Sequence, residues 1–166
     1  MKSYAFANCS NAKWYLDPKD QLDPSGLCYN TSVKRFEEIP HTADWSFRAF
    51  GKDLPELFGN AAFAIFAMEG AVSQNPNDVS RIVEVNAIDY ESLLVNWLTE
   101  LLWLQESQRE AYHRFEIDAL SPTVLRAKIF GRPIRQLDKV IKAVTYHNLK
   151  IEQTKDGWQA VVVVDV

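Results

Sequence analysis

The C-terminal stretch "VIKAVTYHNLKIEQTKDGWQAVVVVDV", Val140 to Val166, shows how this chain is built. Two segments rich in β-branched and aromatic residues flank Asp156 and Gly157, a dipeptide typical of the tight turn between antiparallel strands. The pattern therefore predicts a β-hairpin at the end of the chain. Strands that come in hairpins favour antiparallel sheets over the parallel sheets of alternating α/β proteins.

Segments with strand-like alternation recur along the rest of the chain. They are "RFEEI" at 35–39, "WSFRAF" at 45–50, "RIVEVNA" at 81–87, "HRFEIDAL" at 113–120 and "VLRAKIFG" at 124–131. The first two flank the turn "HTAD", and Gly51 ends the second; the last two flank the turn "SPT" as another hairpin. Residues 132–139, "RPIRQLDK", are expected to form a connecting loop.

Two helices are predicted between these strands. Asp53 and Glu56 form a capping box before an apolar series at helical spacing, which predicts a helix over residues 54–68. Asp89 caps a second helix that is expected to run to about Ala111. This helix is apolar nearly all round between residues 93 and 104, so we expect it to be buried on more than one side. The fold class is α+β: a single domain of largely antiparallel sheets built from hairpins, with two packed helices.

The composition is that of an ordinary globular protein. The chain has 166 residues, of which 47% are apolar and 24% charged. It has no apolar run of the ~20 residues that a membrane-spanning helix needs and no apolar signal-peptide core, so we expect it in the cytoplasm. Residues 1–34 contain two Asp-Pro pairs and little periodicity, which predicts a poorly ordered N-terminal extension before a domain spanning 35–166.

The cysteines, the charge and the absence of glycine-rich motifs argue against several classes of function. Cys9 and Cys28 both lie in the extension, where two free thiols are the expected state and a disulfide between them is the alternative. No thiol is available downstream. Residues 36–166 carry 13 basic and 19 acidic side chains, a balance that disfavours direct binding of RNA or DNA. The sequence also lacks the glycine-rich motifs that cradle phosphates, which argues against an enzyme that consumes nucleotides by itself.

Two aspartates are candidates for a metal site. Asp44 precedes the strand at 45–50, and Asp165 follows four valines, beside the terminal Val166. If these two strand ends meet, carboxylate and main-chain oxygens would form an all-oxygen cluster that suits Ca²⁺ or Mg²⁺. The alternative is structural: Asp44 caps a turn and Asp165 is the solvated end of a strand.

Histidines and a lysine supply further candidates. His41 and His147 could join an aspartate in a transition-metal site, although histidines near strand ends more often have structural roles. Lys142 lies among apolar neighbours that would hold it on a fixed frame, or it is an ordinary surface lysine.

Two alternative functions follow from these residues. One is a small metal-dependent phosphoesterase that uses Asp44, Asp165, His41 and His147. The other is a chaperone-like protein-binding module whose exposed surface includes the second predicted helix. In that module the side chains of Trp97, Leu101 and Trp103 would be partly exposed for a partner.

Four segments taken together resemble the archease family. They are "HTAD" with the strand that follows it, "LPELFGNAAFAIF" at 54–66, "KAVTYH" at 142–147 and "GWQAVVVVDV" at 157–166. The resemblance covers about residues 34–166, with the segments in the same order. Each segment alone is weak, but the set is specific.

The resemblance implies a function. Archeases are small accessory proteins of the GTP-dependent RNA ligase of the RtcB type, which seals tRNA exon halves after intron removal. The ligase forms a histidine-guanylate intermediate, and archease promotes this guanylylation so that the ligase turns over repeatedly. The chain is thus expected to be a non-catalytic activator whose partner is the ligase, with tRNA contacted only through it.

The resemblance also implies site residues. The family's metal site corresponds to Asp44, Asp165 and the main-chain oxygen of Val166, with Ca²⁺ as the expected ion and Mg²⁺ as the alternative. Lys142 corresponds to a lysine important for ligase activation. His41 and His147 would lie in the surroundings of the metal. Archeases often carry an acid two positions before that lysine; here the position is Val140, so any role of that acid is in doubt for this chain.

Overall fold

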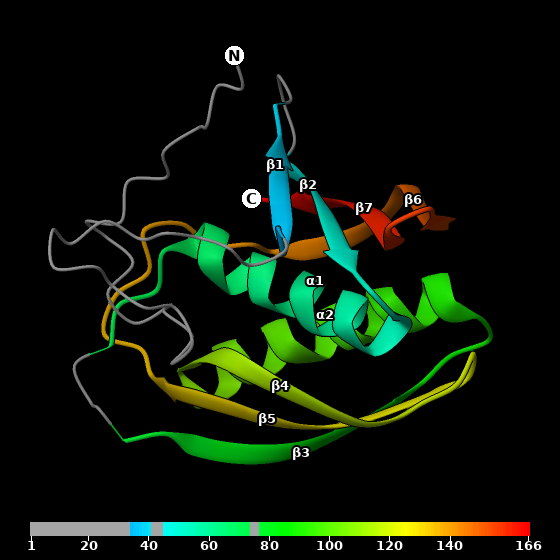
Figure 1. Ribbon diagram of the computed structural model, residues 1–166. Coiled ribbons are helices and arrows are strands. Elements are labelled where there is room, and N and C mark those ends of the chain that lie inside the picture. The colour runs from blue at the N-terminus through cyan, green and yellow to red at the C-terminus, as the bar shows by residue number, and fades with distance from the viewer. Residues whose placement is uncertain (1–33, 41–44, 74–76) are drawn as a thin grey trace, which may run out of the picture. The chain divides into compact units, whose positions relative to one another are not determined.

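The computed structural model describes residues 34–40, 45–73 and 77–166. In this part of the chain two helices lie between two antiparallel sheets (Figure 1). The helices are α1 (Leu54–Glu69) and α2 (Tyr90–Gln108). One sheet has the order β1-β2-β7-β6 and the other β3-β5-β4. The strands are β1 (Phe36–Ile39), β2 (Trp45–Gly51), β3 (Val79–Asn86), β4 (Glu110–Leu120), β5 (Val124–Pro133), β6 (Ala143–Thr154) and β7 (Gly157–Asp165). The α+β class and the antiparallel hairpins are confirmed.

Side-chain caps define the starts of both helices. The Asp53 carboxylate accepts a hydrogen bond from the Glu56 amide at 2.9 Å, and the Glu56 carboxylate accepts one from the Lys52 amide at 2.7 Å. Asp89 caps α2 in the same way, accepting from the Ser92 amide at 2.7 Å. These bonds satisfy amides that have no partner inside the helix, and they confirm the two predicted helix starts.

Helix α2 is buried against both sheets, as its apolar sequence predicted. Trp97 and Leu101 have no exposed surface, and the Trp97 indole donates a hydrogen bond to the carbonyl oxygen of Phe58 at 3.2 Å. The expectation that these two side chains are partly exposed for a partner is therefore wrong. Trp103 differs, because 57% of its surface is exposed.

Several element boundaries differ from the predictions. Helix α2 ends at Gln108 rather than Ala111, because Arg109 adopts a left-handed conformation with φ 58° and β4 begins at once. Strand β6 begins at Ala143 rather than Val140. The three-stranded sheet is longer than predicted, since β3 and β4 begin before residues 81 and 113 and β5 continues to residue 133.

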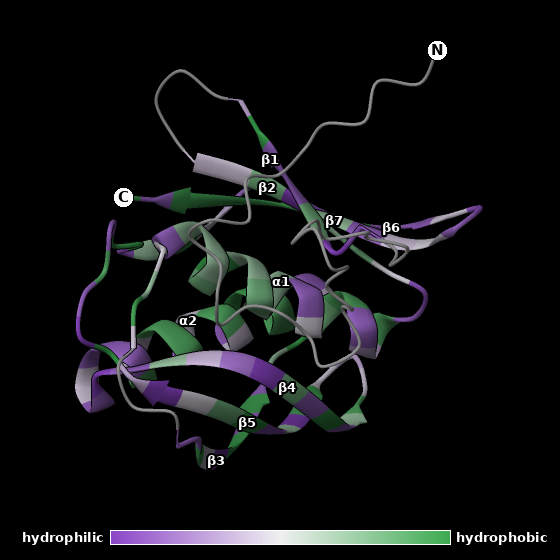
Figure 2. Ribbon diagram, turned by 60° about the vertical axis from the view of Figure 1, so that its left-hand side comes forward, coloured by the Kyte–Doolittle hydropathy of each residue, from purple (hydrophilic) through white to green (hydrophobic). Residues whose placement is uncertain are grey.

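Strand β7 occupies an inner position of the four-stranded sheet, between β2 and β6. Figure 2 shows it as one of the most apolar strands. Gly157 opens it after the predicted turn with φ 132°, a conformation that favours glycine, and a Cβ there would lie 2.3 Å from the carbonyl oxygen of Gly51. Because both neighbours are antiparallel to β7, its C-terminal end lies beside the starts of β2 and β6.

The prediction for the N-terminal residues lies outside the described part. Residues 1–33, which include Cys9 and Cys28, are not among the described residues, so the extension, its boundary at residue 34 and the state of the thiols remain predictions. Neither described helix is long and apolar enough to cross a membrane.

Candidate functional site at the end of strand β7

Three strand ends meet where β7 finishes. Trp45, the first residue of β2, pairs with Val164, and Ala143, the first residue of β6, pairs with Asp165. Asp44 and His41 belong to residues 41–44, which lie outside the described residues. The structure therefore describes the candidate site through Asp165, Val166, Lys142 and their neighbours.

Lys142 is bonded to the last two residues of the chain. Its amide donates a hydrogen bond to the carbonyl oxygen of Asp165 at 2.8 Å, and its Nζ donates one to the main-chain oxygen of Val166 at 3.0 Å. The side chain is otherwise exposed. The structure thus brings together three residues that the sequence analysis selected separately or by resemblance.

The oxygens at this end are accessible to solvent. Val163 and Val164 are both buried, whereas Asp165, at the end of the strand, is exposed. Among the described residues, no side chain donates a hydrogen bond to the Asp165 carboxylate. Val166 is 38% exposed. The site therefore offers carboxylate and main-chain oxygens, the donor chemistry that a hard cation prefers.

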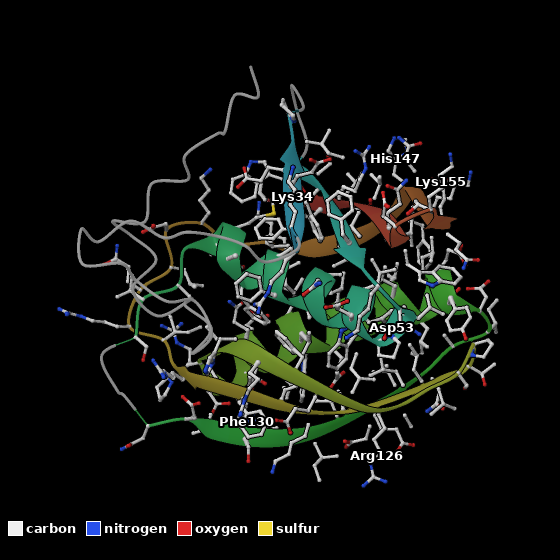
Figure 3. All side chains as sticks on the ribbon, viewed as in Figure 1. Lys34, Asp53, Arg126, Phe130, His147 and Lys155 are labelled. Carbon is white, nitrogen blue, oxygen red and sulfur yellow. The ribbon has the colours of Figure 1, made fainter. Side chains whose placement is uncertain are left out.

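His147 lies in a bulge of β6. The pairing of β6 with β7 jumps from Thr145 to Lys150, and the exposed His147 ring places Nε2 3.0 Å from the side-chain nitrogen Nδ2 of Asn148. Figure 3 places His147 toward the Lys155 side of the sheet, away from the C-terminal end marked in Figure 1. No group of three or more His, Cys, Asp or Glu residues suited to a metal occurs within the described ranges. These residues alone do not assemble the histidine site.

Glu69 is a residue of this region that the sequence analysis missed. It is fully buried at the end of α1, and its carboxylate accepts hydrogen bonds from the Ile141 amide at 2.8 Å and from the Gln105 side chain. Its carbonyl oxygen accepts from the amides of Asp138 and Lys139 at 3.0 and 3.2 Å. Glu69 therefore holds the segment that leads directly into Lys142.

Burial changes the pKa of the Glu69 carboxylate. Removing the carboxylate from water raises its pKa, and the hydrogen bonds from Ile141 and Gln105 only partly oppose this rise. A sequence signal for the residue existed, because Glu69 follows Ile65 and Phe66 at helical spacing and so falls on the buried face of α1. An acid at such a position needs polar partners, and here the loop before β6 supplies one.

Comparisons with known proteins identify the family. Residues 36–166 match the model of the Archease protein family. The archease of Methanosarcina barkeri is 37% identical over 141 residues, which covers 80% of this chain and 97% of the relative. The archease of Pyrococcus abyssi is 35% identical over 142 residues, covering 81% of this chain and 100% of the relative.

Solved structures agree with these relatives. A crystal structure from Thermotoga maritima, of an archease described as a possible chaperone, has a TM-score of 0.59 and 27% identity, covering 78% of this chain and 96% of that chain. A solution structure of a Methanobacterium thermoautotrophicum protein has a TM-score of 0.57 and 29% identity, covering 81% and 100%. The chain therefore belongs to the archease family.

Proposed function

We propose that this chain is a non-catalytic activator of a GTP-dependent tRNA-splicing RNA ligase of the RtcB type. It would promote guanylylation of the ligase and so allow many rounds of exon joining, while touching tRNA only through the ligase. The observation that carries the proposal is the bonding of Lys142 to the last two residues of β7 in a member of the archease family.

The strand register supports the inclusion of Asp44 in the site. Trp45 pairs with Val164, so one further step of the same antiparallel register would set position 44 opposite Asp165. The register of the described residues thus supports the convergence of the two acids.

The donor set fits a hard divalent cation, with Ca²⁺ as the expected ion. Asp44, Asp165 and the main-chain oxygen of Val166 would hold it, and these are the oxygen ligands that Ca²⁺ and Mg²⁺ prefer. Two unit charges 5 Å apart repel by about 3 kcal/mol at an effective dielectric of 20. A bound cation would supply charge neutralisation that lets two carboxylates stay close together.

Lys142 is proposed as the residue that acts on the ligase. Its two hydrogen bonds attach it to the last two residues, and its side chain is exposed rather than buried in the core. An ammonium group presented at a fixed position can stabilise negative charge on a partner's bound nucleotide. The rest of the domain would serve as the frame for this group.

A turnover assay tests the proposal. The purified ligase from the same organism is mixed with GTP, a divalent ion and split tRNA halves, and ligated products per ligase are counted with and without this chain. We expect the chain to raise the count at least about tenfold, which corresponds to about 1.4 kcal/mol. Asp44→Ala should remove the increase, whereas Asp118→Ala, which changes an exposed acid of β4, should retain it.

Two results would contradict the proposal. One is an unchanged turnover count in the presence of the wild-type chain. The other is full stimulation by Asp44→Ala, which would show that the proposed acidic site is not needed to activate the ligase. Phosphoester hydrolysis by the purified chain alone, lost in His147→Ala, would instead support the phosphoesterase alternative.

A further inference from the structure

A groove runs beside the candidate site, between the C-terminal half of α2 and the 134–144 segment. Its volume is about 770 Å³, within the range of roughly 300 to 1,000 Å³ that holds a drug-sized ligand or a few side chains of a peptide. The residues assigned to recognition are Trp103 on the helix, Arg109 directly after its end, and Arg135 and Val140 on the opposite wall. Glu106 and Lys142 also line the groove. The groove therefore shares Lys142 with the proposed activation site.

Large apolar side chains are exposed on both walls of the groove. Trp103 is 57% exposed and Val140 54% exposed. The exposure of Trp103 is not due to loose packing of the helix, because Trp97 and Leu101 of the same helix are fully buried. An accessible tryptophan in a concave site is typical of the residues that dominate the binding energy of protein interfaces.

The charge of the groove is opposite to that of the rest of the domain. Arg109, Arg135 and Lys142 line it together with one acid, Glu106, whereas residues 36–166 as a whole carry six more acidic than basic side chains. Within the described ranges, no carboxylate forms an ion pair with either arginine. The two guanidinium groups are thus available to carboxylates of a partner.

Arg109 occupies an unusual backbone position. Its φ of 58° and ψ of 44° lie in the left-handed region, where a helix most often ends with glycine. An arginine here accepts backbone strain that glycine would avoid. A strained residue that also lines a groove points to a use for its side chain.

The wall opposite α2 is held in place before any partner binds. The Ile134 amide donates a hydrogen bond to the carbonyl oxygen of Arg109 at 2.7 Å, and the Ile141 amide donates one to the Glu69 carboxylate at 2.8 Å. The segment is therefore fixed at Ile134 to the residue that follows α2 and at Ile141 to the last residue of α1. A wall formed in advance lowers the entropy cost of binding.

We propose that this groove receives an acidic segment of the ligase that also presents an apolar side chain. The carboxylates would pair with Arg109 and Arg135, and the apolar side chain would pack against Trp103 and Val140. This inference rests on the proposed function and assigns the ligase a docking surface that continues into Lys142. Nucleic acid is the less suitable occupant, because binders of phosphate backbones carry extended basic surfaces and this domain is acidic outside the groove.

The apolar contact is tested by measuring the affinity of the full-length chain for the purified ligase by calorimetry. Trp103→Glu should weaken binding at least about tenfold, as expected for an interface hot spot. The matched control is Ile82→Glu, which changes an apolar side chain that is 67% exposed on β3 of the three-stranded sheet. This variant should bind the ligase with unchanged affinity. Equal affinities for wild type and Trp103→Glu would overturn the proposal.

Arg109 allows the charge contact to be separated from folding. Arg109→Gly removes the cation and relieves the left-handed strain, so we expect weaker ligase binding with an unchanged or higher melting temperature. Arg109→Lys keeps the charge and should recover part of the affinity, while Arg126→Gln, an exposed cation of β5, should bind as wild type does. Raising the salt concentration from about 0.05 to about 0.5 M should narrow the gap between wild type and Arg109→Gly.

A photocrosslinker identifies the occupant. Benzoylphenylalanine in place of Trp103 is irradiated with the ligase and tRNA halves present, and the crosslinked peptides are sequenced. A crosslink to a carboxylate-rich segment of the ligase supports the proposal. A crosslink to RNA, to residues 1–33 of this chain or to a second copy of the chain overturns it, as does the lack of any crosslink.

The docking surface and the activation can fail separately. Lys142→Ala should bind the ligase within about threefold of wild type, a change below 1 kcal/mol, and still fail to stimulate it. If Trp103→Glu and Arg109→Gly bind and stimulate as wild type does while Lys142→Ala does not stimulate, the groove is wrong and the proposed function stands. If the wild-type chain binds through Trp103 yet never raises turnover, the groove stands and the proposed function fails.

Discussion

The two sheets enclose the same helices, and one site in each shows a different treatment of charged groups. In the three-stranded sheet, the Glu110 carboxylate is 7% exposed and accepts hydrogen bonds from Arg81 Nε at 2.7 Å, Arg81 Nη2 at 2.8 Å and the Tyr112 hydroxyl at 2.8 Å. At the end of β7 in the four-stranded sheet, Asp165 and Lys142 are exposed. The polar groups of the first site are paired within the sheet, while those side chains of the second site remain exposed.

Ionisation reinforces this difference. The Arg81 guanidinium holds the pKa of Glu110 below its ordinary value, although burial opposes the shift. Burial and the hydrogen bond to Glu110 both raise the pKa of Tyr112. The network is therefore an ionised arginine–carboxylate pair with a neutral tyrosine at physiological pH, and its donors and acceptors are used within the sheet. We infer that it serves stability and not activation.

The largest predicted effect separates Lys142 from an otherwise similar lysine. Lys142→Ala should abolish the stimulation of ligase turnover, because it removes the only ammonium bonded to Val166 among the described residues. Its free energy of unfolding should change by less than about 0.5 kcal/mol, as is usual for an exposed site. Lys128→Ala on β5 should leave both quantities near wild type. Ligase turnover counts and urea unfolding measure the two quantities. An equal loss of stimulation in Lys128→Ala and Lys142→Ala would contradict the prediction.

The second prediction concerns the paired network. Glu110→Ala should lower the free energy of unfolding by about 3 kcal/mol, because it leaves the buried Tyr112 hydroxyl without its acceptor and the Arg81 guanidinium with Gln108 alone. Stimulation of the ligase at a temperature where the variant is folded should stay at the wild-type level. Loss of stimulation by the folded variant would show that the Glu110 network and the end of β7 do not have separate roles in stability and activation.

Glu69 gives a prediction with a defined sign. Burial raises its pKa above the ordinary value of 4.5, so above pH 4.5 the folded chain keeps a proton that the unfolded chain has released. The contribution of Glu69 to the free energy of unfolding should therefore fall as the pH rises from 4.5 through the raised pKa, and Glu69→Gln should lack this fall. Urea unfolding of both proteins across this range measures the difference, and parallel curves would contradict it.

The smallest predicted effect is the stabilisation by an ion. At a free Ca²⁺ concentration ten times the dissociation constant, linkage predicts an increase of about 1.4 kcal/mol in the free energy of unfolding. Asp165→Asn should remove most of this increase and, with a chelator present, should have nearly the stability of wild type. An equal response of both proteins to Ca²⁺ would place the ion elsewhere.

Local chemistry made much of the fold predictable. The caps at Asp53 and Asp89 depend on side chains within three residues of the amides that they bind, and the turn at Asp156 and Gly157 depends on two neighbouring residues. Such signals are complete within a short window. The two helix starts and the last hairpin were accordingly confirmed.

Features that depend on distant residues, or that have no local sequence signal, could not be predicted in the same way. The end of α2 was placed three residues late because Arg109 adopts the left-handed conformation without being glycine, and the apolar pattern continues into buried residues of β4. The enclosure of both helices between two sheets requires strand orders that no local pattern encodes. Glu69 was missed because its partner Ile141 is 72 positions away in sequence.

The central claim is that the end of β7 with Lys142 promotes guanylylation of the ligase. The most direct measurement is the rate at which the ligase becomes covalently labelled by radioactive GTP, with RNA omitted so that only this step is observed. The wild-type chain should raise the labelling rate at least about tenfold, while Lys142→Ala and Asp44→Ala should leave it at the rate of the ligase alone. A labelling rate that the wild-type chain does not change, or that both variants raise equally well, would contradict the account.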